Sequence, residues 1–334
     1  MNGRSLRELP KVDLHVHLEG SVRPSTLREF AASHGCAVPP GLTGDEWVFA
    51  DFDDFINNYI AAYACLQHES DFRRIAYEFC EDEAAEGARY AEVTFTLAGH
   101  ALLADDWDMP VLAVLEGFAD GERDFGIRCR LVLDCVHGFP LELAQSTLAS
   151  ALRHRDAGVV ALGLGGDENQ PVDRLFPVFE KAREGGLHSV PHAGETGGPE
   201  NVRRAVDHLG AERIGHGIRV LDDDDLTAEL RHRQIPLEVC PTSNVATGVI
   251  SDLDAHPFNA LRDAGLTVTL NSDDPGMFAS PLAGEYEKAR RVFGLDDHAL
   301  ADIAKAGIHA SFLDDGAKAQ LAADVDAWLQ NARQ

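Results

Sequence analysis

Short apolar runs alternate along the chain with longer segments in which apolar residues recur at the spacing of an α-helix. Buried parallel strands have apolar neighbours on both faces, so they read as continuous apolar runs. Eight runs fit this description, at residues 12–17, 90–95, 127–136, 159–164, 187–192, 213–216, 236–240 and 266–271. The pattern therefore predicts eight strands.

Helical segments separate these runs, as the crossovers between parallel strands require. Examples are residues 141–154, 173–184, 200–209 and 222–233, and a terminal pair of helices is expected after Pro281. This alternation predicts an α/β fold, a single (β/α)8 TIM-type barrel, with a doubly wound sheet as the competing fold. The four aspartates at 222–225 are expected at a solvated helix N-terminus, where the helix dipole favours negative charge. We expect one domain that spans residues 1–334.

Residues 24–87, which follow the first strand, form an inserted segment with helical spacing throughout. Helices are expected at residues 25–34, from residue 53 onward, and at 72–86, the first of them behind Pro24. Five aromatic residues of this segment have two interpretations, as ordinary helix-packing residues or as the apolar wall of a substrate pocket: Phe49, Phe52, Phe55, Tyr59 and Tyr63.

Acidic residues outnumber basic ones by 56 to 29, which gives a formal net charge of −27. This charge repels the phosphates of nucleic acids and anionic membrane surfaces, so neither is an expected partner. The chain has no apolar run long enough for a membrane span, and its first ten residues lack the apolar stretch of a signal peptide. We therefore expect a cytoplasmic protein, and its six scattered cysteines are expected to be buried thiols in a reducing compartment.

Histidine and aspartate recur where the predicted strands end. His15 and His17 end the first strand, His192 ends the fifth, and Asp273 follows the eighth. Because the carboxyl ends of the strands meet at one face of a barrel, these side chains should converge there. Three imidazoles and one carboxylate form a complete ligand set for zinc. The other histidines in helical stretches are interpreted as surface or helix-end residues: His34, His68, His154, His208, His232 and His256.

Two further residues at this face suit a hydrolytic reaction. A zinc ion lowers the pKa of a bound water to about 7, and Glu195, just past the fifth strand, is placed to carry a proton. His216, between two glycines, would orient the attacking oxygen. Taken singly, His216 could be a core histidine, Glu195 a helix cap, and Asp273-Asp274-Pro275 a turn or N-cap. Their shared position at one face of one barrel favours a catalytic site.

Six motifs, in order, resemble those of the adenosine deaminase family of purine aminohydrolases over essentially the whole chain. They are His15-Val16-His17-Leu18, Gly165-Gly166-Asp167-Glu168, His192-Ala193-Gly194-Glu195, Arg213-Ile214-Gly215-His216-Gly217, Cys240-Pro241-Thr242-Ser243-Asn244 and Leu270-Asn271-Ser272-Asp273-Asp274-Pro275. The resemblance implies zinc ligation by His15, His17, His192 and Asp273. It also implies that Glu195 protonates N1 of the purine and that His216 orients the water. For substrate binding it implies contacts of Asp274 with N7 and of the Gly166 backbone N–H with N3.

The resemblance thus implies zinc-dependent hydrolytic deamination of adenosine or a related 6-aminopurine nucleoside, a free small molecule. One zinc ion per subunit is expected, because Gly163 to Gly166 stand where relatives with two metals have a lysine. Two residues depart from the family pattern on the sugar side: Glu19 replaces an aspartate directed at the 5′-hydroxyl, and Gly163 replaces an aspartate. Adenine and aminodeoxyfutalosine, an intermediate of menaquinone synthesis, are therefore alternative substrates. A non-catalytic protein that binds zinc or purines is the alternative of another class.

Overall fold

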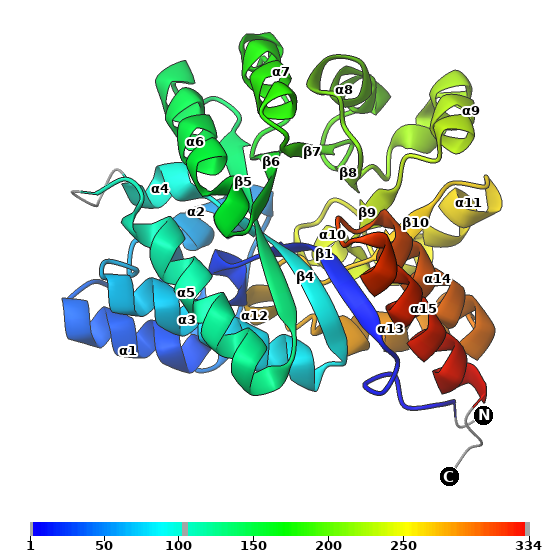
Figure 1. Ribbon diagram of the computed structural model, residues 1–334, viewed down its shortest axis with the longest axis horizontal. Helices are drawn as coiled ribbons and strands as arrows, with labels where there is room; N and C mark the ends of the chain where they lie inside the picture. The colour runs from blue at the N-terminus through cyan, green and yellow to red at the C-terminus, as the bar shows by residue number, and fades with distance from the viewer. Residues whose placement is uncertain (1–2, 102–105, 331–334) are drawn as a thin grey trace.

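The computed structural model describes residues 3–101 and 106–330, and an eight-stranded parallel sheet forms its centre (Figure 1). The strands are β1 (Lys11–His17), β4 (Ala88–Phe95), β5 (Arg128–Val136), β6 (Val159–Gly165), β7 (His188–Ala193), β8 (Ile214–His216), β9 (Leu237–Val239) and β10 (Val268–Leu270). Each strand pairs with the next one along the chain, and a parallel bridge between Val16 and Asp273 joins the two edges. The predicted (β/α)8 barrel and its eight strands are confirmed.

Helices surround the strands (Figure 1). The α-helices outside the inserted segment are α4 (Leu97–Ala101), α5 (Met109–Phe125), α6 (Leu141–His154), α7 (Phe176–Glu184), α8 (Pro199–Arg204), α9 (Asp224–Arg233), α10 (Pro241–Ala246), α11 (Phe258–Asp263), α12 (Pro275–Phe278), α13 (Leu282–Arg291), α14 (Asp297–Ala310) and α15 (Asp315–Gln330). The predicted pair after Pro281 is wrong, because three longer helices follow this residue. The predicted helix at 200–209 changes to a π-helical turn after Arg204. At the aspartate run, the Asp223 carboxylate caps α9 by accepting from the Leu226 amide, as expected of a helix N-terminus.

The inserted segment contains α1 (Pro24–His34), α2 (Phe52–Tyr63) and α3 (Glu69–Ala85), but it is not helical throughout as predicted. A short antiparallel hairpin of β2 (Leu42–Thr43) and β3 (Glu46–Trp47) separates α1 from α2. Gly35, in the left-handed conformation, ends α1, and the prolines and glycines that follow it favour turns. The carboxylate of Asp51 then starts α2 by accepting a hydrogen bond from the Asp54 amide.

The barrel interior is built in layers. Val132, Ala161 and Val190, on three neighbouring strands, form an apolar cluster against which Phe312 packs. Since residues two apart share a face of a strand, the next residues along the same faces, such as His192, lie nearer the carboxyl ends of the strands. This arrangement supports a polar site on an apolar floor.

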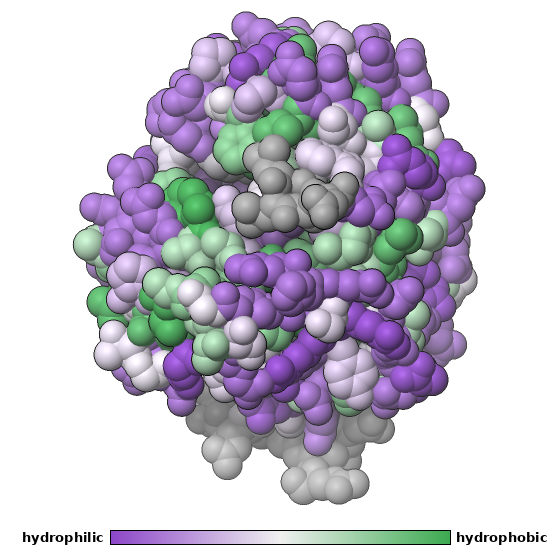
Figure 2. Space-filling view, turned by 90° about the vertical axis from the view of Figure 1, so that its left-hand side faces the viewer, coloured by the Kyte–Doolittle hydropathy of each residue, from purple (hydrophilic) through white to green (hydrophobic). Residues whose placement is uncertain are grey.

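The face shown in Figure 2 is mostly hydrophilic, with small separate apolar patches. Five large apolar side chains are exposed among the described residues: Val38, Val48, Ile60, Leu112 and Leu152. The six cysteines are free, and only Cys36 is not fully buried. In the part of the chain that the structure describes, no helix combines the length and hydropathy that a membrane span requires.

Candidate active site

The four predicted metal ligands come together at the carboxyl end of the barrel. Ligand atoms of His15, His17, His192 and Asp273 all lie within 4.8 Å of one another. Nε2 of His17 lies 3.2 Å from Nε2 of His192 and 3.4 Å from Oδ1 of Asp273. Two imidazole nitrogens at this distance need a proton or a cation between them. We call these four residues the metal-candidate cluster.

The electrostatics of the metal-candidate cluster fit a cation. Burial lowers the pKa of His17 and, more strongly, that of His192, so both rings are neutral, which is the form that binds metals. Burial also lowers the pKa of His15, but its hydrogen bonds to Asp273 and Glu238 outweigh this effect and raise the pKa to about 10. The pocket between these carboxylates therefore attracts positive charge.

A second set of possible ligands shares two members with the metal-candidate cluster, adding His216 and Cys240 to His15 and Asp273. Burial raises the pKa of the Cys240 thiol well above its usual range. A protonated thiol is a poor metal ligand, because the thiolate is the form that binds. The set of three histidines and one aspartate is therefore the better fit, and its nitrogen and oxygen donors suit zinc.

Two residues of the site have strained backbones. Asp273 and His216 adopt left-handed conformations, with φ of 64° and 58°. For Asp273 the strain is offset by hydrogen bonds on both sides, since its amide donates to the His15 carbonyl and its carbonyl accepts from the His17 amide. Strain of this kind is concentrated at functional sites.

A buried charge network supports His15 from below. Nδ1 of His15 lies 3.0 Å from Oε2 of Glu238, so Nδ1 carries a proton that it donates to this carboxylate, and Nε2 is directed at Asp273. Glu238 in turn accepts from the fully buried guanidinium of Arg213, which also donates to Glu92 and to the Ala310 carbonyl. Such outer partners fix the orientation of a ligating imidazole.

Glu195 is held by a neighbouring carboxylate. Glu168 accepts hydrogen bonds from four successive amides, those of Gly194, Glu195, Thr196 and Gly197, at 2.7 to 3.3 Å. Burial, followed by the negative charges of Asp273 and Glu168, raises the pKa of the Glu195 carboxyl well above its usual range. The shift favours the protonated form of this side chain, which can donate a proton.

A chain of hydrogen bonds determines the tautomer of His216. The Phe258 amide donates to Nδ1 of His256, which leaves the proton of that ring on Nε2, 3.2 Å from Oδ1 of Asn244. Nδ2 of Asn244 must then be the donor to Nδ1 of His216, at 3.2 Å. His216 thus carries its proton on Nε2, which lies 3.7 Å from Glu195. The expectation that His256 is a surface or helix-end residue is wrong, because this side chain is buried within the network.

Asp274 is buried beside the metal-candidate cluster. Its Oδ1 has no hydrogen-bond partner among the described residues, and burial, then the charge of Asp273, raises the pKa of this carboxyl well above its usual range. A Cβ at Gly20 would lie 1.8 Å from this oxygen, so only glycine fits next to it. Gly166, at the end of β6, has a φ of 92° that also favours glycine.

Glu19 does not present a free carboxylate to the site. Its Oε1 accepts from the Thr96 amide at 2.8 Å and from Nε2 of His100 at 3.0 Å, and Oε2 accepts from the Tyr59 hydroxyl at 3.2 Å. Tyr59 therefore lies over the site, whereas Phe55 packs against Phe278. The helix-packing interpretation fits Phe55, and the position of Tyr59 beside Glu19 is compatible with the pocket-wall interpretation, which stays a prediction.

Several supporting residues were not identified from the sequence. Glu238 and Asp134 are acidic residues within otherwise apolar strands, and this exception to the pattern is a signal that could have revealed them. Glu168 and Asn244 belong to recognised motifs, but their contacts depend on the fold.

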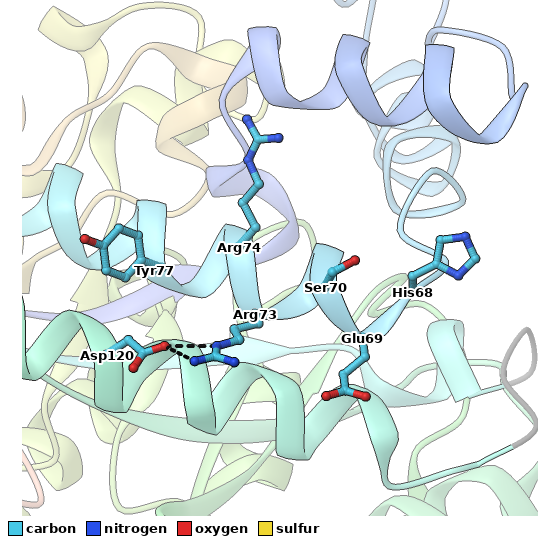
Figure 3. Close-up of a pocket in the computed structure, with 7 residues that line it drawn as sticks. All are labelled: His68, Glu69, Ser70, Arg73, Arg74, Tyr77 and Asp120. Atoms are coloured by element: carbon cyan, nitrogen blue, oxygen red, sulfur yellow. Dashed lines mark hydrogen bonds and ion pairs between the residues drawn. The ribbon is translucent and has the colours of Figure 1, made fainter.

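A surface hollow lies elsewhere, along α3 (Figure 3). Its cations are already neutralised, since Arg73 donates to Asp120 and Arg74 pairs with Glu29 and Glu78. No member of the metal-candidate cluster lines this hollow, and we assign no function to it.

Comparisons with known proteins agree with this geometry. The family model described as adenosine deaminase matches residues 10–328. An aminodeoxyfutalosine deaminase from Streptomyces coelicolor is 43% identical over 331 residues, covering 96% of this chain and 86% of the relative. The adenine deaminase structure from Arthrobacter aurescens superposes with a TM-score of 0.91 at 31% identity, covering 96% and 99% of the two chains. An amidohydrolase structure from Burkholderia ambifaria with bound Zn has a TM-score of 0.89 at 28% identity, covering 97% and 92%.

Proposed function

The chain belongs to the adenosine deaminase family, and we propose that it is a zinc-dependent enzyme that hydrolyses the 6-amino group of a 6-aminopurine, releasing ammonia and a 6-oxopurine. The observation that carries this proposal is the meeting of the metal-candidate cluster with two buried acids, Glu195 and Asp274, at one end of the barrel. The enzyme is a hydrolase acting on carbon–nitrogen bonds.

The donors of the site are complementary to the ring of adenine. N1, N3 and N7 of this ring are all acceptors, so a protein that binds them must offer donors. The pKa values of Glu195 and Asp274 are raised well above their usual range, which favours the protonated form that can donate to N1 and N7. The backbone N–H of Gly166 is the donor that we assign to N3.

Glu195 and His216 have separate roles in the reaction. A proton delivered by Glu195 to N1 draws electron density from C6 and makes this carbon a better electrophile. His216, neutral with its proton on Nε2, donates to the attacking oxygen and orients it. A zinc ion held by His15, His17, His192 and Asp273 would supply the Lewis acidity that makes water a nucleophile at neutral pH.

The contacts of Glu19 argue against adenosine as the preferred substrate. Both oxygens of Glu19 already accept hydrogen bonds from the chain, two at Oε1 and one at Oε2, which leaves little acceptor capacity for a 5′-hydroxyl. A substrate that lacks this hydroxyl fits better. We therefore place aminodeoxyfutalosine, the substrate named for a relative 43% identical, before adenosine. Free adenine is the second candidate, because it also lacks this hydroxyl and relatives named adenine deaminase are similar to this chain.

A substrate panel tests the proposal. Release of ammonia from adenine, adenosine, a 5′-thio-substituted adenosine and aminodeoxyfutalosine is ranked by kcat/KM, with cytidine and guanine as negative controls. We expect a 6-aminopurine without a 5′-hydroxyl to lead by about tenfold or more, a difference worth about 1.4 kcal/mol. A lead for adenosine would contradict the ranking, and activity on none of them with zinc bound would contradict the function and favour a non-catalytic binding protein.

A further inference from the structure

Asp134, on β5, faces the barrel interior. Val132, two residues earlier, belongs to the interior apolar cluster, and residues two apart share a face of a strand. Asp134 therefore lies one layer above the apolar floor, toward the carboxyl ends of the strands. By the same alternation from Val190, His192 lies in this layer too.

The neighbouring strand leaves space for this carboxyl group. Asp134 pairs in register with Gly163, and a Cβ at residue 163 would lie 3.2 Å from the Asp134 Cβ. A Cβ at Gly165 would lie 3.2 Å from Oδ2 of Asp134 and 4.0 Å from Cε1 of His192. The carboxyl group therefore stands beside the strand position where the family pattern has an aspartate and this chain has Gly163.

One oxygen of the Asp134 carboxyl has no partner in the chain. The residue is 3% exposed, and its Oδ1 receives no hydrogen bond from any described residue. Burying an acceptor without a partner costs free energy, so such atoms are expected where a ligand supplies the missing bond. Burial, followed by the charge of Glu19, raises the pKa of this carboxyl to about 8, although the Thr96 side chain interacts with the carboxyl and lowers this value.

The surroundings show which part of a substrate this oxygen faces. The strand order places β5 beside β6, so Asp134 lies next to the strand that leads to Gly166. Under the proposed function, Asp274 binds N7 and Gly166 binds N3. In a purine, N9 lies on the ring edge between N7 and N3. Around the barrel, β1, β4 and β5 separate Asp274, after β10, from the end of β6, so Asp134 on β5 comes between Asp274 and Gly166 in this order.

We propose that Asp134 is a substrate-binding residue on the N9 side of the purine, where its Oδ1 accepts a hydrogen bond. This inference rests on the proposed function and adds a residue that binds the N9 side of the ring. The donor is either the N9–H of a free base or a hydroxyl group of a sugar. Apart from the 6-amino group, N9–H is the donor of the adenine ring, so a free acceptor complements the three donors already assigned.

The test compares substrates with and without this donor. Wild type and Asp134→Ala are assayed with adenine, adenosine and 9-methyladenine, which has neither N9–H nor a hydroxyl. We expect the kcat/KM of adenine or adenosine, relative to that of 9-methyladenine, to fall about 10- to 100-fold in the variant, as when a buried donor is left without an acceptor. A fall for adenine identifies N9–H as the donor, and a fall for adenosine identifies a sugar hydroxyl.

Three controls keep the inference falsifiable. Asp134→Asn retains an acceptor oxygen and should keep more of the preference than Asp134→Ala. Ser189→Ala, which removes a buried hydroxyl on β7 that donates to the Leu209 carbonyl, should leave the preference unchanged. Calorimetry compares the affinities for hypoxanthine and 9-methylhypoxanthine, and so tests the same contact without turnover. If wild type deaminates no 6-aminopurine, the proposed function fails, but the ratio of the affinities for hypoxanthine and 9-methylhypoxanthine still tests the role of Asp134. Equal ratios in wild type and Asp134→Ala would overturn the inference about Asp134.

Discussion

Nδ2 of Asn244 lies 3.2 Å from Nδ1 of His216, and this contact fixes the proton of the imidazole on the opposite nitrogen. Asn244→Asp has the same shape but no donor, so His216 would have to place its proton on Nδ1 and lose it from Nε2. We expect kcat to fall by about 10²-fold or more, since a wrong tautomer in a catalytic triad costs about 10⁴-fold. Steady-state kinetics measure this, with zinc content as the control. An unchanged kcat would show that the contact with Asn244 does not determine the tautomer of His216.

Glu195→Gln should retain zinc and substrate binding but lose most turnover. The amide keeps the shape of the side chain and cannot deliver a proton to N1. General acid catalysis contributes about 10²- to 10⁴-fold, and kcat should fall by this factor with little change in the Kd of the product. Turnover within a few-fold of wild type would make Glu195 a structural residue.

Elemental analysis of protein purified without added metal should find about one zinc per chain. His15→Ala should lose it, because this change removes a ligand. Glu238→Gln should weaken zinc binding by about 10- to 100-fold while leaving all four ligands in place, because it disturbs the partner of His15 Nδ1. Competition with a chelator measures both effects. Full zinc retention in His15→Ala would exclude the metal-candidate cluster as the zinc site.

Asp134→Asn should change how stability depends on pH. An acid whose pKa rises to about 8 on folding, from 3.8, takes up a proton as the chain folds. Stability from this residue is therefore constant below pH 4 and falls as pH rises between the two values. The stability of Asp134→Asn relative to wild type should increase from pH 5 to pH 8, by up to about 4 kcal/mol. Urea unfolding at both pH values measures it, and a pH-independent difference would contradict the raised pKa.

Gly163→Asp should be destabilising in the wild-type background. Its Cβ would lie 3.1 Å from Val132 and 3.2 Å from Asp134, and it would add a second acid to the same space. We expect a loss of about 1 to 3 kcal/mol, as for an overpacked core. The double variant Asp134→Gly, Gly163→Asp restores a single carboxyl and should recover most of the loss. Additive effects of the two changes would show that the sites are independent.

The sequence predicts the barrel and the metal-candidate cluster well because both depend on local rules. Strands show as apolar runs, and the ligands lie where those runs end. The support of the site depends instead on which strands become neighbours: the contact of His15 with Glu238 joins residues 223 positions apart. The same is true of Asp134, whose carboxyl occupies space left by a glycine on another strand. Within the inserted segment, the hairpin was missed because its strands are only two residues long.

The network below His15 reaches the far end of the chain. Glu92 accepts from the Phe312 amide, and Arg213 donates to the Ala310 carbonyl. During synthesis on the ribosome, all four ligands of the metal-candidate cluster emerge before this last support does. A nascent chain that ends before Phe312 would contain all four candidate ligands but would lack the Phe312 amide that donates to Glu92. We therefore expect a metal ion to bind stably only after residues 310–312 have joined the fold.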